Sequence, residues 1–227
     1  MQKFATPATT TTALSAVLDI PAGHIRLIAA DRTDATVEVL PANPTKSRDI
    51  KAAEDIRIDY TDGVLAITAP PARNQLFGPS GSVEITVQLP TGSRVEAHGA
   101  AADFRGVGRL GDVTVTAAQG PVKIDEATSL HATLQDGDIT VGRLNGPAQI
   151  STLRGDIRVT EADRGTVTLS TQKGDITIAT APGTSATLDA GTSYGRIHNS
   201  LTNTEGPHAP LAIRATTSYG DITARSL

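Results

Sequence analysis

Histidines and carboxylates are the residues from which catalytic or metal chemistry would have to be built in this sequence. No two histidines stand at the spacing of a metal-ligand pair. They are scattered along the chain, as His24, His98, His131, His198 and His208. The carboxylates, such as Asp136 and Asp138, are spread just as evenly, which disfavours the converging acid pair of a glycosidase. The sequence therefore predicts no metal site and no catalytic residues.

One glycine pattern suggests a nucleotide site. Residues 106–111 read Gly-Val-Gly-Arg-Leu-Gly, which has the spacing of a dinucleotide-binding loop. Such a loop must lead into a helix, whereas Asp112 to Thr116 alternate like a strand. A Gly-x-Ser-x-Gly nucleophile motif does not occur either. We therefore expect no bound cofactor and predict that the protein is not an enzyme.

The phrase Gly-Asp-Ile recurs in the second half of the chain, and its aspartates raise the hypothesis of calcium binding. It occurs as Gly137-Asp138-Ile139, Gly155-Asp156-Ile157, Gly174-Asp175-Ile176 and Gly220-Asp221-Ile222. Calcium-binding β-rolls carry a denser glycine-aspartate repeat, and here Pro121 and Arg196 replace the aspartate in two related phrases. A role at tight corners is favoured, because an aspartate side chain can accept hydrogen bonds from nearby backbone amides.

The spacing of the corner glycines indicates the elements that carry these phrases. The glycines are Gly120, Gly137, Gly155, Gly174, Gly195 and Gly220, separated by 17, 18, 19, 21 and 25 residues. A period near this length is typical of stacked structural repeats. Two residues after each glycine stands a β-branched residue: Val122, Ile139, Ile157, Ile176, Ile197 or Ile222. A second alternating apolar row lies halfway between these positions, as expected for a strand with one buried face.

These rows predict an all-β fold, a parallel β-solenoid with about two strands per coil and coils of roughly 18–20 residues. A meander of antiparallel hairpins is the alternative. It explains the alternation but not the return of the same phrase in every second strand. We assign the solenoid repeats to residues 93–227.

The first ninety residues lack the repeat. Residues 1–12 read as a disordered lead-in, and residues 13–92 as a hairpin-rich N-terminal β part that caps one end of the solenoid in one continuous body. Asp62-Gly63 is a hairpin signal, and residues 41–54 read as a loop. Because the chain stops directly after a repeat strand, we expect residues 209–227 to form an uncapped end, and we predict self-association through this C-terminal coil.

Four residues form the candidate contact surface. Leu76 and Phe77 stand in a loop rich in proline and glycine, where they either plug the core or contact a partner. Tyr194 and Tyr219 belong to the repeated phrase Thr-Ser-Tyr-Gly. On adjacent coils these tyrosines would form either an aromatic binding platform or a stacking ladder that stabilises the last coils.

Composition narrows the range of partners. Hydrophobic residues make up 38% of the chain but aromatic residues only 3%, which suits a thin aliphatic core better than a lipid, sugar or nucleotide cleft. The net charge of −4 disfavours a nucleic-acid partner. There is no cysteine, no secretory signal and no apolar stretch long enough to span a bilayer. We therefore expect a cytoplasmic protein without direct membrane insertion.

The Gly-Asp-Ile repeats, the closing Thr-Ser-Tyr-Gly-Asp-Ile phrase and the hairpin-rich first half resemble a large bacterial family of β-strand repeat domains, known as putative adhesins or toastrack domains. The resemblance covers nearly the whole chain. It implies a non-enzymatic protein, and it offers no catalytic residues to transfer. Some members of that family accompany envelope-stress and membrane-associated systems.

Together these observations predict a non-catalytic β-solenoid scaffold or interaction protein with an unidentified protein partner, self-associating and linked to envelope or stress-related systems. The alternative is a polysaccharide-binding or polysaccharide-cleaving β-helix protein. The short coils and evenly spread charges disfavour that alternative, since β-helix lyases have larger coils with clustered carboxylates.

Overall fold

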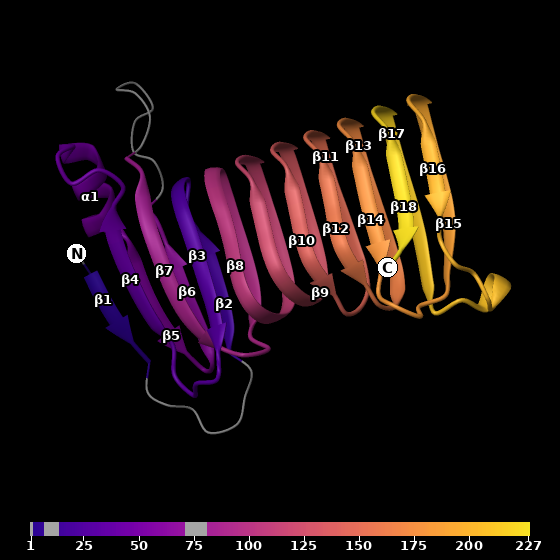
Figure 1. Ribbon diagram of the computed structural model, residues 1–227. Coiled ribbons are helices and arrows are strands. Elements are labelled where there is room, and N and C mark those ends of the chain that lie inside the picture. Colours follow the sequence, from indigo (N-terminus) through magenta and orange to yellow (C-terminus); the bar gives the residue numbers. More distant parts are fainter. Residues whose placement is uncertain (1, 7–13, 71–80) are drawn as a thin grey trace.

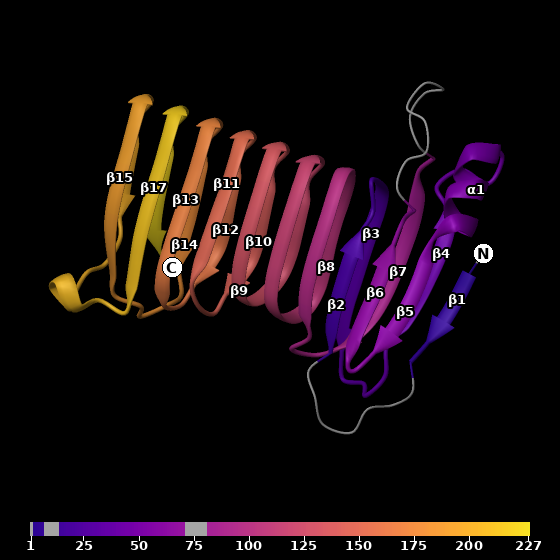
Figure 2. The same cartoon turned by 180° about the vertical axis from the view of Figure 1, so that it is seen from behind.

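The computed structural model describes residues 2–6, 14–70 and 81–227. Its strands form a long row of stacked coils, each of which crosses two facing layers (Figures 1 and 2). The predicted all-β solenoid is thus confirmed. The regular coils consist of β8 (Arg94–Gln119), β9 (Val122–Asp136), β10 (Ile139–Leu144), β11 (Ala148–Arg154), β12 (Ile157–Ala162), β13 (Gly165–Lys173) and β14 (Ile176–Thr180).

Successive coils pair in parallel, and equivalent repeat positions lie side by side. Ile139 aligns with Val122 on one side and with Ile157 on the other. All three side chains are fully buried between the two layers. The second row predicted from the sequence is buried in the same way, as Ile150 and Leu169 show. The core is therefore a thin layer built mainly of Val, Ile, Leu and Ala, with Phe104 of β8 as its buried aromatic residue beside Val122. Its burial removes apolar surface from water.

The last coil in the sequence is not the last coil in space. Strand β17 (Leu211–Tyr219) pairs with β13 on one side and with β15 (Ala186–Tyr194) on the other. Likewise β18 (Ile222–Ser226) lies between β14 and β16 (Ile197–Ser200). The expectation that residues 209–227 form the exposed end is therefore wrong. Coil β15–β16 forms that end of the solenoid (Figure 1).

The connection after β16 makes this order feasible. Residues 201–210, which include the short helix η2 (Gly206–His208), lead the chain back so that the next coil enters between two others. Of the last two coils, the more apolar one occupies the inner position. Coil β17–β18 buries Leu211, Ile213, Ala215, Ile222 and Ala224. Coil β15–β16 instead has Asn199 in the core row, in register with Ala224, and β16 is exposed throughout.

Parallel stacking continues into the first ninety residues. Strands β2 (Ser15–Asp19) and β3 (Ala22–Ala30) lie between β8 and the pair β6 (Val64–Thr68) and β7 (Val83–Pro90). As a result the first coil in the sequence is also an inner coil. The hairpin predicted at Asp62-Gly63 is confirmed: β5 (Arg57–Thr61) pairs antiparallel with β6, and both turn residues have positive φ.

Antiparallel strands and a helix close this end of the stack. Strand β4 (Thr36–Pro41) pairs antiparallel with β7 and with β1 (Gln2–Ala5), which lies within the segment expected to be disordered. Residues 41–54, expected to be a loop, contain most of helix α1 (Ser47–Asp55). The helix buries Ala53 and Asp49, and an Asp49 carboxylate oxygen accepts the Ser82 N–H at 3.0 Å. No helix in the described ranges has the length and apolar character of a bilayer span.

Candidate interaction site

All regular coils turn at the same corner, and the corner glycine is required there by sterics. A Cβ on Gly155 would lie 2.2 Å from the Gly137 carbonyl oxygen, and the φ of Gly155 is +138°. Both the close approach of the coils and the left-handed backbone exclude a side chain. The corner glycines therefore allow adjacent coils to approach closely, and they align the residues that precede and follow the corner in each coil.

The corner aspartates form a ladder of hydrogen bonds between coils. An oxygen of Asp138 accepts the N–H of Asp156, Asp156 accepts that of Asp175, and Asp175 accepts that of Asp221, each at 2.8 Å. At the end of the ladder Asp221 accepts the N–H of Arg196, also at 2.8 Å. The predicted corner role of the aspartates is confirmed. Within residues 2–6, 14–70 and 81–227, no group of three or more acidic or histidine side chains has the arrangement of a metal site.

A second ladder is made by threonines that the sequence analysis missed. Thr171 donates to the Gly155 carbonyl at 3.1 Å, Thr217 to that of Gly174 at 3.1 Å and Thr192 to that of Gly220 at 3.0 Å. Thr171 and Thr217 are buried, so the bond satisfies a hydroxyl that would otherwise be costly to bury. The signal in the sequence is a threonine three residues before the corner glycine, at Thr152, Thr171, Thr192 and Thr217.

Tyr194 and Tyr219 stand directly before the corner on adjacent coils. Their rings stack with centroids 4.9 Å apart and an interplanar angle of 5°. Both side chains remain largely exposed, at 68% and 57%. The structure thus brings these two predicted contact residues together as a stacked aromatic pair. In the same row Lys173 is the register partner of Tyr219, and Arg154 that of Lys173, so two basic side chains continue the row.

The end coil adds an apolar residue to this pair. Ile197 was expected in the core but is 46% exposed, because β16 has a neighbouring coil on one side only in the described chain. The residues that correspond to Ile197 in the inner coils are bonded to the coil on their outer side. The Ile176 N–H donates to the Asp221 carbonyl, and the Ile222 N–H donates to the Arg196 carbonyl, each at 2.9 Å. We call the surface formed by Tyr194, Ile197 and Tyr219 the aromatic end.

The other two predicted contact residues, Leu76 and Phe77, lie outside the described residues. The structure therefore places only the tyrosine half of the predicted contact surface.

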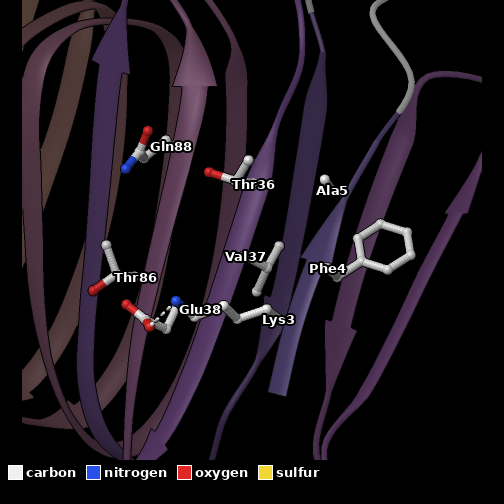
Figure 3. Close-up of a pocket in the computed structure, with 8 residues that line it drawn as sticks. All are labelled: Lys3, Phe4, Ala5, Thr36, Val37, Glu38, Thr86 and Gln88. Carbon is white, nitrogen blue, oxygen red and sulfur yellow. Dashed lines mark ion pairs between the residues drawn. The ribbon is translucent and has the colours of Figure 1, made fainter. Parts of the chain in front are cut away.

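A shallow groove of about 380 Å³ lies on the outer side of β1, β4 and β7 at the opposite end of the stack (Figure 3). Its lining includes an ion pair between Lys3 and Glu38, with nitrogen and oxygen 3.2 Å apart. Beside it, Arg32 hydrogen-bonds to Asp34, and this bond lowers the pKa of the Asp34 carboxyl below its ordinary value. Lys3 and Glu38 pair across neighbouring strands, and Arg32 and Asp34 pair within the turn after β3. Their arrangement indicates a structural role.

Comparison with known proteins identifies the fold. The family model Toastrack DUF4097 matches residues 16–226. A putative adhesin from Bacteroides fragilis has a TM-score of 0.56 at 17% identity, covering 100% of this chain and 97% of that one. A putative adhesin and a putative lipid binding protein from Parabacteroides distasonis have TM-scores of 0.45 and 0.43, at 14% and 11% identity. They cover 100% and 98% of this chain and 97% and 96% of their own. No curated protein matches.

Proposed function

This chain belongs to the Toastrack DUF4097 family, and we propose that it is a non-catalytic β-solenoid scaffold that binds a protein partner through its aromatic end. The observation that carries the proposal is the exposed, stacked pair of Tyr194 and Tyr219. Exposed aromatic side chains that are held rigid are the usual anchors of protein interfaces.

The number and location of the aromatic residues support this proposed binding surface. The sequence has only three Phe, three Tyr and no Trp among 227 residues. Two of the three tyrosines stand together on the surface. Stacking on parallel strands also fixes their rotamers before a partner arrives, so little side-chain entropy remains to be lost on binding. A partner that binds this end of the solenoid would cover apolar ring surface, and the same end coil exposes Ile197.

The distribution of charged groups supports the non-catalytic part of the proposal. Several charged side chains of the outer faces pair with a neighbour on the next coil, as do Arg105 with Asp125 at 2.6 Å and Arg143 with Glu161 at 3.0 Å. The corner carboxylates accept backbone amides. Groups engaged in this way hold adjacent coils in register and do not converge on a common point.

The test compares immobilised wild-type protein with two double variants. Tyr194→Ala/Tyr219→Ala removes both rings, and Ser193→Ala/Ser218→Ala alters the preceding residues of the same strands as a matched control. We expect a specific protein to be retained by the wild type and by the serine variant, and to be lost from the tyrosine variant. Equal retention by all three proteins, or no retained protein, would contradict the proposal.

A glycan array distinguishes the alternative, because a tyrosine ring can also stack on a sugar ring. Glycan binding by the wild type that disappears with the tyrosine variant would replace the protein partner by a polysaccharide. Release of shorter chains from a bound polysaccharide would contradict the non-catalytic assignment as well. We expect neither result.

The cytoplasmic location and the link to envelope or stress-related systems also remain proposals. The link is supported by family membership alone. Fractionation of cells that produce the native protein tests both points. We expect the protein in the soluble fraction, with a part bound to the envelope that high salt releases. Recovery only from the cell exterior would overturn the proposed location.

A further inference from the structure

Residues 182–209 are an insertion into an otherwise regular solenoid. Between β12 and β13 the chain turns through the two residues Asp163 and Arg164. The ends of the next connection lie at equivalent positions. Thr180 at the end of β14 aligns with Ala162 at the end of β12, and Leu211 at the start of β17 aligns with Gly165 at the start of β13.

The residues that flank the insertion already occupy the places of a short turn. The Ala181 N–H donates to the Ala162 carbonyl at 2.8 Å, and the Gly165 N–H donates to the Pro210 carbonyl at 2.9 Å. Ala181 and Pro210 therefore stand beside the two ends of the Asp163-Arg164 turn. Joining Ala181 directly to Pro210 would give β14–β17 a connection of the same two-residue length. The inserted coil β15–β16 is thus an addition beyond a complete stack.

We infer that residues 182–209 cover a self-association edge on β17–β18, and that the partner which this edge fits is a second copy of the chain. The edge has all the groups that join one inner coil to the next. Asp221 accepts the Arg196 N–H, the Gly220 carbonyl accepts the Thr192 hydroxyl, and the Ile222 N–H donates to the Arg196 carbonyl. Equivalent bonds hold the inner coils together.

Coil β15–β16 takes up these bonds but offers a poorer edge to any further coil. Arg196 stands where the inner coils have the ladder aspartate, and Asn199 stands in the core row. The row of outer hydroxyls also stops there: Ser170 aligns with Thr216, but Thr216 aligns with Gly191. Repeat proteins need such polar terminal repeats, because a bare repeat edge promotes association.

The geometry of the two ends determines how two copies would meet. The uncovered edge would present β17 and β18, one strand on each side of the thin core, and a second edge of the same kind matches this arrangement. The opposite end of the molecule carries the antiparallel strands β1 and β5 instead of a parallel edge. Because the two ends differ in this way, we expect two β17–β18 edges to meet head to head. That arrangement is an antiparallel, two-fold and closed dimer.

Deleting residues 182–209 and joining Ala181 to Pro210 tests this inference. We expect the deletion variant to keep the β-sheet circular dichroism spectrum and to have twice the monomer mass in light scattering. The full chain should be monomeric at the same concentration. A folded but monomeric deletion variant, or a full chain that associates equally, would overturn the inference. Species that grow steadily with concentration would overturn the closed dimer.

Point variants keep the inference testable if the deletion variant does not fold. A Cβ on Gly195 would lie 1.9 Å from the Gly220 carbonyl oxygen, so Gly195→Ala must push coil β15–β16 away from β17–β18. A Cβ on Gly191 meets nothing within 4 Å, so Gly191→Ala is the matched control. We expect a concentration-dependent dimer for Gly195→Ala and a monomer for Gly191→Ala. Identical masses for the two variants would contradict the inference, and the readout is independent of partner binding.

Discussion

The ring of Tyr194 stacks on the ring of Tyr219 with a centroid distance of 4.9 Å, and the residue closer to the C-terminus belongs to the inner coil. This contact joins the inserted coil β15–β16 to the coil that follows it in sequence. It therefore has two consequences, one for the stability of the end of the solenoid and one for its surface.

The tyrosine contact should stabilise the end coil. Offset or parallel aromatic pairs contribute about 0.5–1.5 kcal/mol beyond the area they bury. We expect a double-mutant cycle of Tyr194→Ala and Tyr219→Ala, measured by urea denaturation, to give a coupling energy of about 0.5–1 kcal/mol, near the lower limit because the rings are exposed. Ser193→Ala, next to Tyr194 on the same strand, should show no coupling to Tyr219→Ala. Additive effects of the two tyrosine changes would contradict a stabilising stack.

The aspartate ladder gives a prediction for Asp175, which accepts the N–H of Asp221 and donates its own N–H to Asp156. Asp175→Ala removes one inter-coil acceptor, so we expect a melting temperature lower by about 2–4 °C, as for the loss of about 1 kcal/mol in a domain of this size. Asp175→Asn keeps an acceptor oxygen and should lose less than half of that. Asp189→Ala, on the exposed side of β15, is the control and should leave the melting temperature unchanged.

The threonine ladder predicts a cost for losing a buried hydroxyl at constant shape. Thr171→Val would leave the Gly155 carbonyl without the donor that now lies 3.1 Å away. We expect a loss of about 1 kcal/mol in the free energy of unfolding, measured by urea denaturation. Thr168→Val on the outer face of the same strand tests whether the effect depends on burial. A larger loss for Thr168→Val than for Thr171→Val would show that the ladder does not carry the stability assigned to it.

Local pattern was enough to predict the solenoid and most of its core. The alternation around Ile139, Ile157 and Ile176 specified one buried face, and these side chains are buried. The repeated Thr-Ser-Tyr-Gly phrase also placed Tyr194 and Tyr219 on neighbouring coils. Helix α1 was missed because its nine residues are mostly polar and only Asp49 and Ala53 are buried.

Coil order could not be derived from the same pattern. Ile197 and Ile222 occupy identical places in their repeats, so alternation alone puts both in the core, whereas burial depends on which coil has two neighbours. The relevant signal was the spacing of 25 residues between Gly195 and Gly220, which leaves room for a return connection. For the same reason Ile197 was missed as part of the aromatic end.

Disulfide trapping tests the order of the coils directly, because the chain has no native cysteine. Ser170 and Thr216 are register partners on neighbouring strands, whereas Ser170 and Gly191 are separated by β17. Adjacent strands lie about 4.8 Å apart, within reach of a disulfide, and alternate strands do not. We expect Ser170→Cys/Thr216→Cys to form an intramolecular disulfide under mild oxidation and Ser170→Cys/Gly191→Cys to remain reduced. The reverse result would show that coils β13–β14 and β15–β16 are neighbours and would contradict the insertion of β17–β18 between them.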